Sequence, residues 1–128
     1  MKGLFKKAKR LIKKQGYFLL YYDVVGSQNF AEKNGYKELY GRLKKFHALV
    51  NRRFKNSIVK KEIGLNRKLE KFRTIVGDSG GAYFSDCKVI IPIAELATET
   101  LPFRLRWGIA ENGWDRKSFE KKNMKITA

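Results

Sequence analysis

The chain has 128 residues, 43% of them hydrophobic, and its 29 lysines and arginines against 12 aspartates and glutamates give a formal net charge of +17. This length predicts one domain with one hydrophobic core, and the positive charge favours polyanionic partners: nucleotides, nucleic acid or an anionic membrane surface. The single cysteine, Cys87, excludes an intramolecular disulfide and fits a cytoplasmic setting. The single histidine, His47, lies in a helical pattern, so Ser-His-Asp, Cys-His and zinc-histidine chemistry are set aside.

Residues 1–15 are predicted to form a short, basic, amphipathic helix. Their apolar residues recur at helical spacing on one face, with lysines opposite: Leu4, Phe5, Ala8, Leu11 and Ile12. The apolar core is too short for a signal peptide, and the chain has no run of about 18 apolar residues that would span a membrane. The helix is expected either to pack on the domain or on a partner chain, or to contact a membrane surface peripherally. Residues 16–128 are expected to form the single domain.

Residues 17–25, read YFLLYYDVV, predict a strand that is covered on both faces, because the run is almost continuously apolar. Gly26 to Gly35 is predicted as a loop plus the opening of a helix, with Ser27 or Asn29 as its cap. The longest helix is predicted at residues 36–55, with a basic outer face. Its apolar stripe recurs at steps of three and four residues and consists of Leu39, Leu43, Phe46, Val50 and Phe54.

Residues 56–70 predict only a short strand or helix followed by a loop. Residues 71–76 and 81–86 predict the two strands of a hairpin joined by GDSGG, whose glycines allow positive φ. A helix beginning around Pro92 is predicted within residues 88–99, and the alternation of PFRLRWGIA predicts a fourth strand at residues 102–110. The polar tail from Glu111 fits a helix, a short strand or a loose end.

The order strand, helix, hairpin, helix, strand predicts an α+β fold. We expect a ferredoxin-like βαββαβ palm domain, with helices on one face of an antiparallel sheet and the basic N-terminal helix added. In this topology the first strand and the hairpin lie close together in the sheet, so Asp23 and Asp78 are expected to meet at one rim. Spacing alone leaves a second interpretation open, because aspartate beside glycine is also ordinary turn chemistry.

Two carboxylates at one rim are what a magnesium-nucleotide site requires. Two Mg²⁺ or Mn²⁺ ions would bind Asp23, Asp78 and the carbonyl of Val24. The turn that opens the next helix offers backbone N–H groups and a positive helix end to phosphates, through Val25, Gly26, Ser27, Gln28 and Asn29. Basic strand residues are candidates for stabilising charge on the phosphoryl oxygens: Lys71, Arg73, Arg104 and Arg106.

These stretches resemble the catalytic domain of class III nucleotidyl cyclases and its relatives, the GGDEF and CRISPR-polymerase palm domains. YYDVVGSQNF is similar to the family's first strand and phosphate-binding turn, TIVGDSGGAYF to the hairpin with the second metal aspartate, and LPFRLRWGIAENG to the strand that ends in a Gly-Ile pair. The matches come in the family's order and span residues 17 to 113. The resemblance implies that Asp23 and Asp78 bind two divalent ions, and that Gly26, Ser27 and their neighbours bind the triphosphate.

The chain departs from the family's pattern at three places. Thr74, with Arg73 beside it, stands where cyclases carry a base-reading lysine, and these two residues are predicted to bind the nucleotide there. The cyclase segment with a transition-state asparagine and arginine has no match, and Asn112 and Arg116 are the only stand-ins. The hairpin also lacks a GGDEF or GGDD sequence. The base, and the choice between a cyclic mononucleotide and a cyclic oligonucleotide product, are therefore left open.

We predict a metal-dependent enzyme that converts a nucleoside triphosphate, ATP or another, to a cyclic nucleotide and pyrophosphate, as a homodimer with the site at the subunit interface. One alternative is a catalytically inactive, nucleotide-binding regulatory protein, which the departures favour. Another is a basic nucleic-acid-binding module, in which aromatic residues on the predicted strands stack on bases: Tyr21, Tyr83 and Phe103.

Overall fold

The computed structural model describes residues 2–11, 18–59 and 71–110. The predictions for residues 12–15, for 60–70 and for the tail from Glu111, with Asn112 and Arg116, lie outside the described residues. The helices and strands are α1 (Lys2–Leu11), β1 (Phe18–Val24), α2 (Ser27–Asn34), α3 (Tyr36–Arg53), β2 (Arg73–Val76), β3 (Ser79–Phe84), α4 (Ile90–Thr100) and β4 (Leu105–Ala110), with short 3₁₀ turns η1 (Lys55–Ser57) and η3 (Cys87–Val89).

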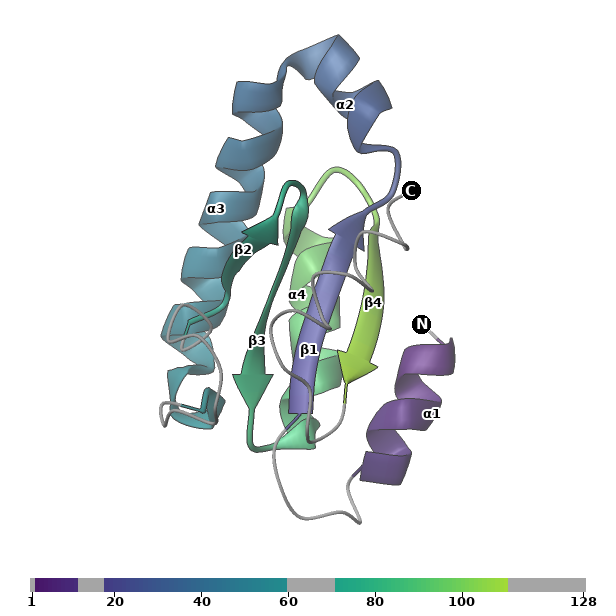
Figure 1. The fold of residues 1–128 in the computed structure, drawn as a ribbon, viewed down its shortest axis with the longest axis vertical. Helices are drawn as coiled ribbons and strands as arrows, with labels where there is room; N and C mark the ends of the chain where they lie inside the picture. Colours follow the sequence, from purple (N-terminus) through teal and green to yellow (C-terminus); the bar gives the residue numbers. More distant parts are fainter. Residues whose placement is uncertain (1, 12–17, 60–70, 111–128) are drawn as a thin grey trace.

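The described strands form one antiparallel sheet in the order β2-β3-β1-β4, which confirms the predicted α+β class (Figure 1). β1 lies in the interior of the sheet, between β3 and β4, and all seven of its residues are buried. This burial explains its continuous hydrophobicity, because a strand covered on both faces has no solvent side on which to place polar residues. The prediction that both faces of this strand are covered is confirmed.

Alternate residues of β1 point to opposite faces of the sheet. Phe18, Leu20, Tyr22 and Val24 belong to the main core, together with the inner faces of α3 and α4. In Figure 1, α4 runs behind the strands on this side of the sheet. The other β1 residues, Leu19, Tyr21 and Asp23, are buried on the opposite face. The chain therefore places Asp23 on the face that α3 and α4 do not cover.

The N-terminal helix α1 packs on the domain. Leu4 and Ala8 are buried in the main core, where α1 contacts α4 and β4. Packing of the apolar face, the first of the two roles predicted for this helix, is confirmed for these two residues. No described helix combines the length and the apolarity that crossing a membrane requires.

The start of α2 differs from the predicted cap. Gly26, in the left-handed conformation with φ 71°, is the N-cap, and no side chain makes a cap hydrogen bond, so the prediction of Ser27 or Asn29 as cap is wrong. At the other end, Gly35 adopts φ 88° and separates α2 from α3. Positive φ favours glycine at both points, because a side chain there would be strained.

The hairpin turn is shorter than predicted. Only Gly77, with φ 55°, and Asp78 lie between the strands, whereas Gly80 and Gly81 belong to β3. These two glycines serve close packing instead of turning: a Cβ on Gly80 would lie 2.7 Å from a ring carbon of Tyr22.

The helix α4 begins at Ile90, two residues before Pro92, and not around Pro92 as predicted. Proline is tolerated in the first helical turn, because its missing N–H would have no partner there.

A cluster of aromatic residues fills the core between α3 and the sheet. The Tyr22 ring lies 5.8 Å from Phe72 and 6.3 Å from Phe46, measured between centroids, and its hydroxyl is hydrogen-bonded to Nε2 of His47. His47 is buried on the inner face of α3, which confirms the prediction of a helix-face residue. Burial lowers the pKa of His47 to about 4 and raises the pKa of Tyr22, so both groups are neutral at pH 7.

We expect His47 to make the protein less stable in acid. The pKa of His47 is 6.5 in the unfolded chain and about 4 in the folded one, so between these values the unfolded state binds the extra proton and stability falls as pH decreases. The loss amounts to about 3 kcal/mol between pH 7 and pH 4. Urea unfolding across this range measures it. His47→Gln keeps a polar partner for Tyr22 without the titration, and an equally steep decline in that variant would contradict the assignment.

Candidate functional site

Three segments meet at the end of the sheet where β1 finishes: the C-terminus of β1, the β2–β3 turn and the start of β4 (Figure 1). We call this end the rim. In the register of the sheet, Asp23 lies directly opposite Ser79 on β3 and Arg106 on β4. Directly opposite residues project on the same face of a sheet. Asp23, Ser79 and Arg106 therefore form one row across the face that α3 and α4 do not cover.

The carboxylate of Asp23 is buried and incompletely compensated. Asp23 is only 4% exposed, and its Oδ1 makes no hydrogen bond within the described part of the chain. The Nε atom of Arg106 lies 3.7 Å from this oxygen, within ion-pair range but too far for a hydrogen bond. Burial raises the pKa of Asp23, the Arg106 charge lowers it in part, the Asp78 charge raises it further, and a backbone hydrogen bond lowers it slightly. A buried carboxylate in this state favours an additional cation.

Asp78 reaches the same rim from the β2–β3 turn. It immediately precedes Ser79, the cross-strand partner of Asp23, and is partly buried. Its charge raises the pKa of both Asp23 and Tyr22. The two aspartates therefore lie at one end of the sheet and interact electrostatically, in the arrangement that the sequence predicts. Their binding of metal ions stays a prediction.

Ser79 belongs to the rim but was not among the predicted site residues. Its side chain is 1% exposed, and its Oγ makes no hydrogen bond to any described residue. Unsatisfied buried hydroxyls are uncommon in proteins and often have a functional explanation. The sequence signal is its place directly after Asp78. Its position opposite Asp23 depends on the register of β3, which the sequence pattern leaves undetermined.

The segment between β1 and α2 adjoins the rim. Val24 ends the strand, and the Val25 backbone N–H donates to the carbonyl of Arg104 at 2.9 Å, which ties this segment to the start of β4. Because α2 lacks a side-chain cap, the N–H groups of its first turn are not occupied by a cap side chain. Among the predicted phosphate-binding side chains, Gln28 donates to Glu32 at 3.3 Å, whereas Ser27 and Asn29 lie near it in the same first turn.

The other two predicted nucleotide-binding residues, Arg73 and Thr74, lie farther away, on the outer strand β2. Arg73 is opposite Gly81 and Thr74 is opposite Gly80, so β3 separates both from β1. Arg73 shares the face of Asp23 but stands one row farther from the rim, and Thr74 belongs to the opposite face with Tyr22. The sheet does not bring these two residues into the row of Asp23.

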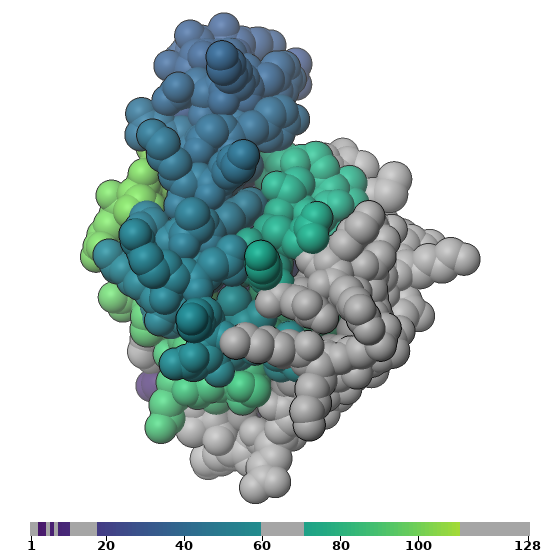
Figure 2. Space-filling model, turned by 90° about the vertical axis from the view of Figure 1, so that its left-hand side faces the viewer, coloured from purple at the N-terminus to yellow at the C-terminus, as the bar shows by residue number. Residues whose placement is uncertain are grey.

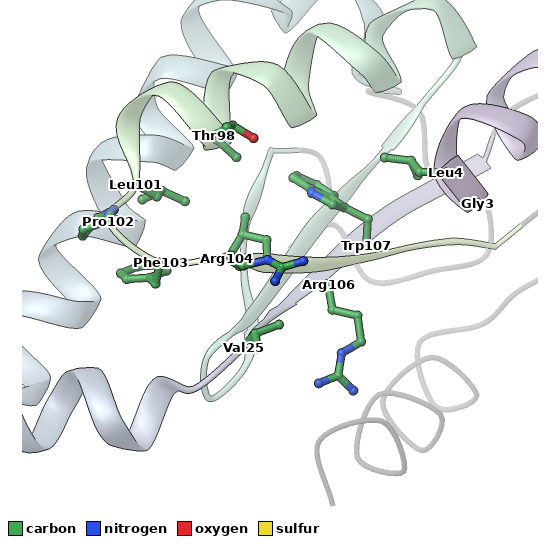
Figure 3. A pocket seen from close by; sticks show the side chains of 12 residues that line it. Gly3, Leu4, Val25, Thr98, Leu101, Pro102, Phe103, Arg104, Arg106 and Trp107 are labelled. Carbon is green, nitrogen blue, oxygen red and sulfur yellow. The ribbon is translucent and has the colours of Figure 1, made fainter. Parts of the chain in front are cut away.

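A pocket of about 700 Å³ lies beside the rim, between α1, the end of α4 and the start of β4 (Figure 3). Val25 and Arg106 line its edge and connect it with the rim. In Figure 3, Thr98 and Trp107 lie on the α4 side of β4, whereas the guanidinium of Arg106 extends to the other side. Arg106 therefore borders both the pocket and the Asp23 carboxylate, whereas Asp23 itself does not line the pocket.

The donor atoms at the rim suit a hard cation. Among the described residues, no group of three or more His, Cys, Asp or Glu side chains is placed to hold a metal ion. Mg²⁺ requires less than this, because it is usually bound by one or two carboxylates together with water and substrate phosphates. The under-compensated Asp23, the neighbouring Asp78 and the unsatisfied Ser79 hydroxyl offer oxygen ligands of this kind, so the residues present fit a magnesium ion.

Comparison of the chain with family models, curated proteins and solved structures finds no significant match. The residues of the rim themselves must therefore carry any assignment of function.

Proposed function

We propose that the protein is a metal-dependent, nucleotidyl cyclase-like enzyme on a ferredoxin-like palm domain, and that it converts a nucleoside triphosphate to a cyclic nucleotide and pyrophosphate. The observation that carries the proposal is the buried Asp23 oxygen, which accepts no hydrogen bond from any residue that the structure describes, in the electrostatic field of Asp78 and near the start of α2, which has no side-chain cap. The strand order β2-β3-β1-β4 supports the palm assignment, because the strand order of the ferredoxin-like fold is the same.

Asp23, Asp78 and the carbonyl of Val24 would hold two Mg²⁺ or Mn²⁺ ions. When bound, the ions would help deprotonate the attacking hydroxyl and neutralise charge on the leaving pyrophosphate. The backbone N–H groups of Gly26 to Asn29 would bind phosphate oxygens, since a helix N-terminus attracts anions. The Arg106 side chain is 55% exposed, which leaves its guanidinium accessible to a phosphate. We further propose that the site is completed at the interface of a homodimer.

Product analysis with each nucleoside triphosphate tests this proposal. We expect cyclic product and pyrophosphate in the presence of Mg²⁺ or Mn²⁺, none after chelation, and a loss of about 10²-fold or more in Asp78→Asn, as for removal of a charge-stabilising group. Asp86→Asn is the matched control, because Asp86 is exposed and only caps η3, a role that asparagine also fills. Turnover that persists in Asp78→Asn, or that falls equally in Asp86→Asn, would refute the assigned site.

The Arg106 ion pair favours a second candidate, a nucleotide-binding regulatory protein without catalysis. In this case the guanidinium, 3.7 Å from Asp23, is the cation that compensates the carboxylate and no metal ion is needed. Calorimetry separates the two functions. Triphosphate binding that is unchanged by chelation and is followed by no product supports the regulatory protein, whereas binding that requires the metal supports the enzyme.

A further inference from the structure

The outer side of α3 carries a continuous row of positive charge. At 3.6 residues per turn, six of its exposed residues from Lys37 to Arg52 that face away from the core fall within a sector of about 100°. They are Lys37, Gly41, Lys44, Lys45, Ala48 and Arg52, and all are exposed. We call these residues the α3 strip. It extends over roughly 22 Å of helix at 1.5 Å per residue.

One carboxylate borders the α3 strip, and it is paired with an arginine. The only acid between residues 37 and 52 is Glu38, which lies at the edge of the sector, where its Oε1 accepts a hydrogen bond of 2.8 Å from Nε of Arg42. The uncharged members, Gly41 and Ala48, are small. A polyanion can therefore approach the helix closely between the cations, without a large side chain or a like charge in its path.

Two exposed tyrosines stand at the beginning of the same helix. Tyr36 and Tyr40 are 55% and 46% exposed, and their rings stack with centroids 6.0 Å apart and planes 27° apart. Tyr40 lies one helical turn before Lys44, so the ring pair adjoins the α3 strip. Figure 2 looks onto this side of the molecule, where α2 and the beginning of α3, in blue, project beyond the remainder of the chain.

These tyrosines differ from the aromatic residues that the sequence suggested for base stacking. Tyr21 and Tyr83 on the strands are buried, at 8% and 3% exposure, and Phe103 packs its ring 5.0 Å from that of Phe30. The prediction is therefore wrong for Tyr21 and Tyr83, because neither tyrosine has a ring face open to solvent, whereas Phe103 is half-buried and lies just before β4. Tyr36 and Tyr40 have accessible rings beside a row of cations, which is the combination that single-stranded nucleic acids bind.

We propose that the outer face of α3 binds single-stranded nucleic acid, with a base stacked on the Tyr36–Tyr40 pair and the phosphates along Lys37, Lys44, Lys45 and Arg52. A duplex hides the faces of its bases and could use only the cations. A helix that binds an anionic bilayer inserts large apolar side chains into the acyl region, and the uncharged residues of the α3 strip are only Gly41 and Ala48. The proposal is independent of the nucleotide site, since it involves neither Asp23 nor Asp78.

Fluorescence anisotropy with a labelled 12-nucleotide single strand of mixed sequence, and with its duplex, tests the proposal. We expect the single strand to bind at least about tenfold more tightly than the duplex. The logarithm of its association constant should fall with the logarithm of the salt concentration with a slope of about −3, from four phosphate contacts at −0.7 each. The triple variant Lys37→Gln, Lys44→Gln, Lys45→Gln should bring this slope to about −1. The matched control, Lys6→Gln, Lys9→Gln, Lys88→Gln, changes net charge equally at exposed sites elsewhere and should keep the original slope.

Variants of the two tyrosines test the stacking step. Tyr36→Ala with Tyr40→Ala should weaken single-strand binding about tenfold or more without changing the salt slope, whereas Tyr36→Phe with Tyr40→Phe keeps the rings and should bind within about twofold of the wild type. Circular dichroism establishes that each variant is folded. Equal affinity for the duplex, an equal loss in the lysine control, or full binding without the rings would overturn the proposal. Binding to phosphatidylserine vesicles without binding to the oligonucleotide would also overturn it. A change of oligomeric state in Tyr36→Ala with Tyr40→Ala would do so as well, because the rings would then belong to a protein interface.

Discussion

Replacing Asp23 with asparagine is expected to abolish metal-dependent nucleotide turnover and, at the same time, to raise the melting temperature of the protein. Turnover should fall by about 10²-fold or more, because the variant loses a ligand of the metal ions that would neutralise charge at the reacting phosphate. Stability should increase at pH 7, because burial and the Asp78 charge make the ionised carboxylate unfavourable in the folded state and raise its pKa. A residue that costs stability but is needed for activity is typical of a functional site.

The pH dependence gives this expectation a definite sign. The pKa of Asp23 is 3.8 in the unfolded chain and higher in the folded protein. Between the unfolded-state pKa and the folded-state pKa, the unfolded chain has released its proton while the folded state still holds it, so wild-type stability falls as pH rises through this interval. Asp23→Asn should lack this decline. Thermal unfolding of both proteins from pH 3.5 to pH 7 measures the difference, and a lower melting temperature of the variant at pH 7 would contradict the under-compensated carboxylate.

Arg106→Gln is the companion variant, with the opposite expected sign. Because the Arg106 charge lowers the pKa of Asp23, its removal should destabilise the wild type at pH 7. It should destabilise Asp23→Asn much less, since the carboxylate is then absent. The double-mutant cycle isolates the interaction between the two side chains from any other contact of Arg106. Equal effects of Arg106→Gln in both backgrounds would mean that the 3.7 Å pair contributes no interaction energy.

Gly81→Ala is expected to destabilise the protein by about 3 kcal/mol, at the upper end of the usual cost of overpacking. A Cβ at this position would overlap the backbone carbonyl oxygen of Leu20 and lie 2.9 Å from Cα of Tyr21. Both are atoms of β1, the buried strand that pairs with β3. Relief of the overlap would require β1 and β3 to separate, because backbone atoms cannot rotate away as a flexible side chain can. Urea unfolding measures the change.

Gly41→Ala provides the control for this prediction. Gly41 lies in the interior of α3, and a Cβ there meets nothing within 4 Å. Alanine has the higher helix propensity, so this substitution should stabilise the protein by about 1 kcal/mol. Opposite signs for the same chemical change would establish that Gly81 is required by the pairing of β1 with β3. A mild effect of Gly81→Ala would imply that the two strands pair less closely than described.

The sequence alone determined the type and the order of the main elements. The continuous apolar run predicted β1, the stripe from Leu39 to Val50 predicted α3, and the alternation around Trp107 predicted β4. These patterns could be read because they are local: a strand repeats every two residues and an amphipathic helix every 3.6, whatever the remainder of the chain does. The order of the elements then placed Asp23 and Asp78 at the same end of the sheet.

Only the tertiary structure decided which side chains meet there. Ser79 and Arg106 are 56 and 83 residues from Asp23 in the sequence, and a shift of one residue in the register would turn them to the other face. Exposure was likewise a tertiary property: Tyr21 is buried, whereas Tyr36 and Tyr40 face solvent. The physical reason is that cross-strand register and burial depend on contacts between distant segments, which periodicity along the chain does not encode.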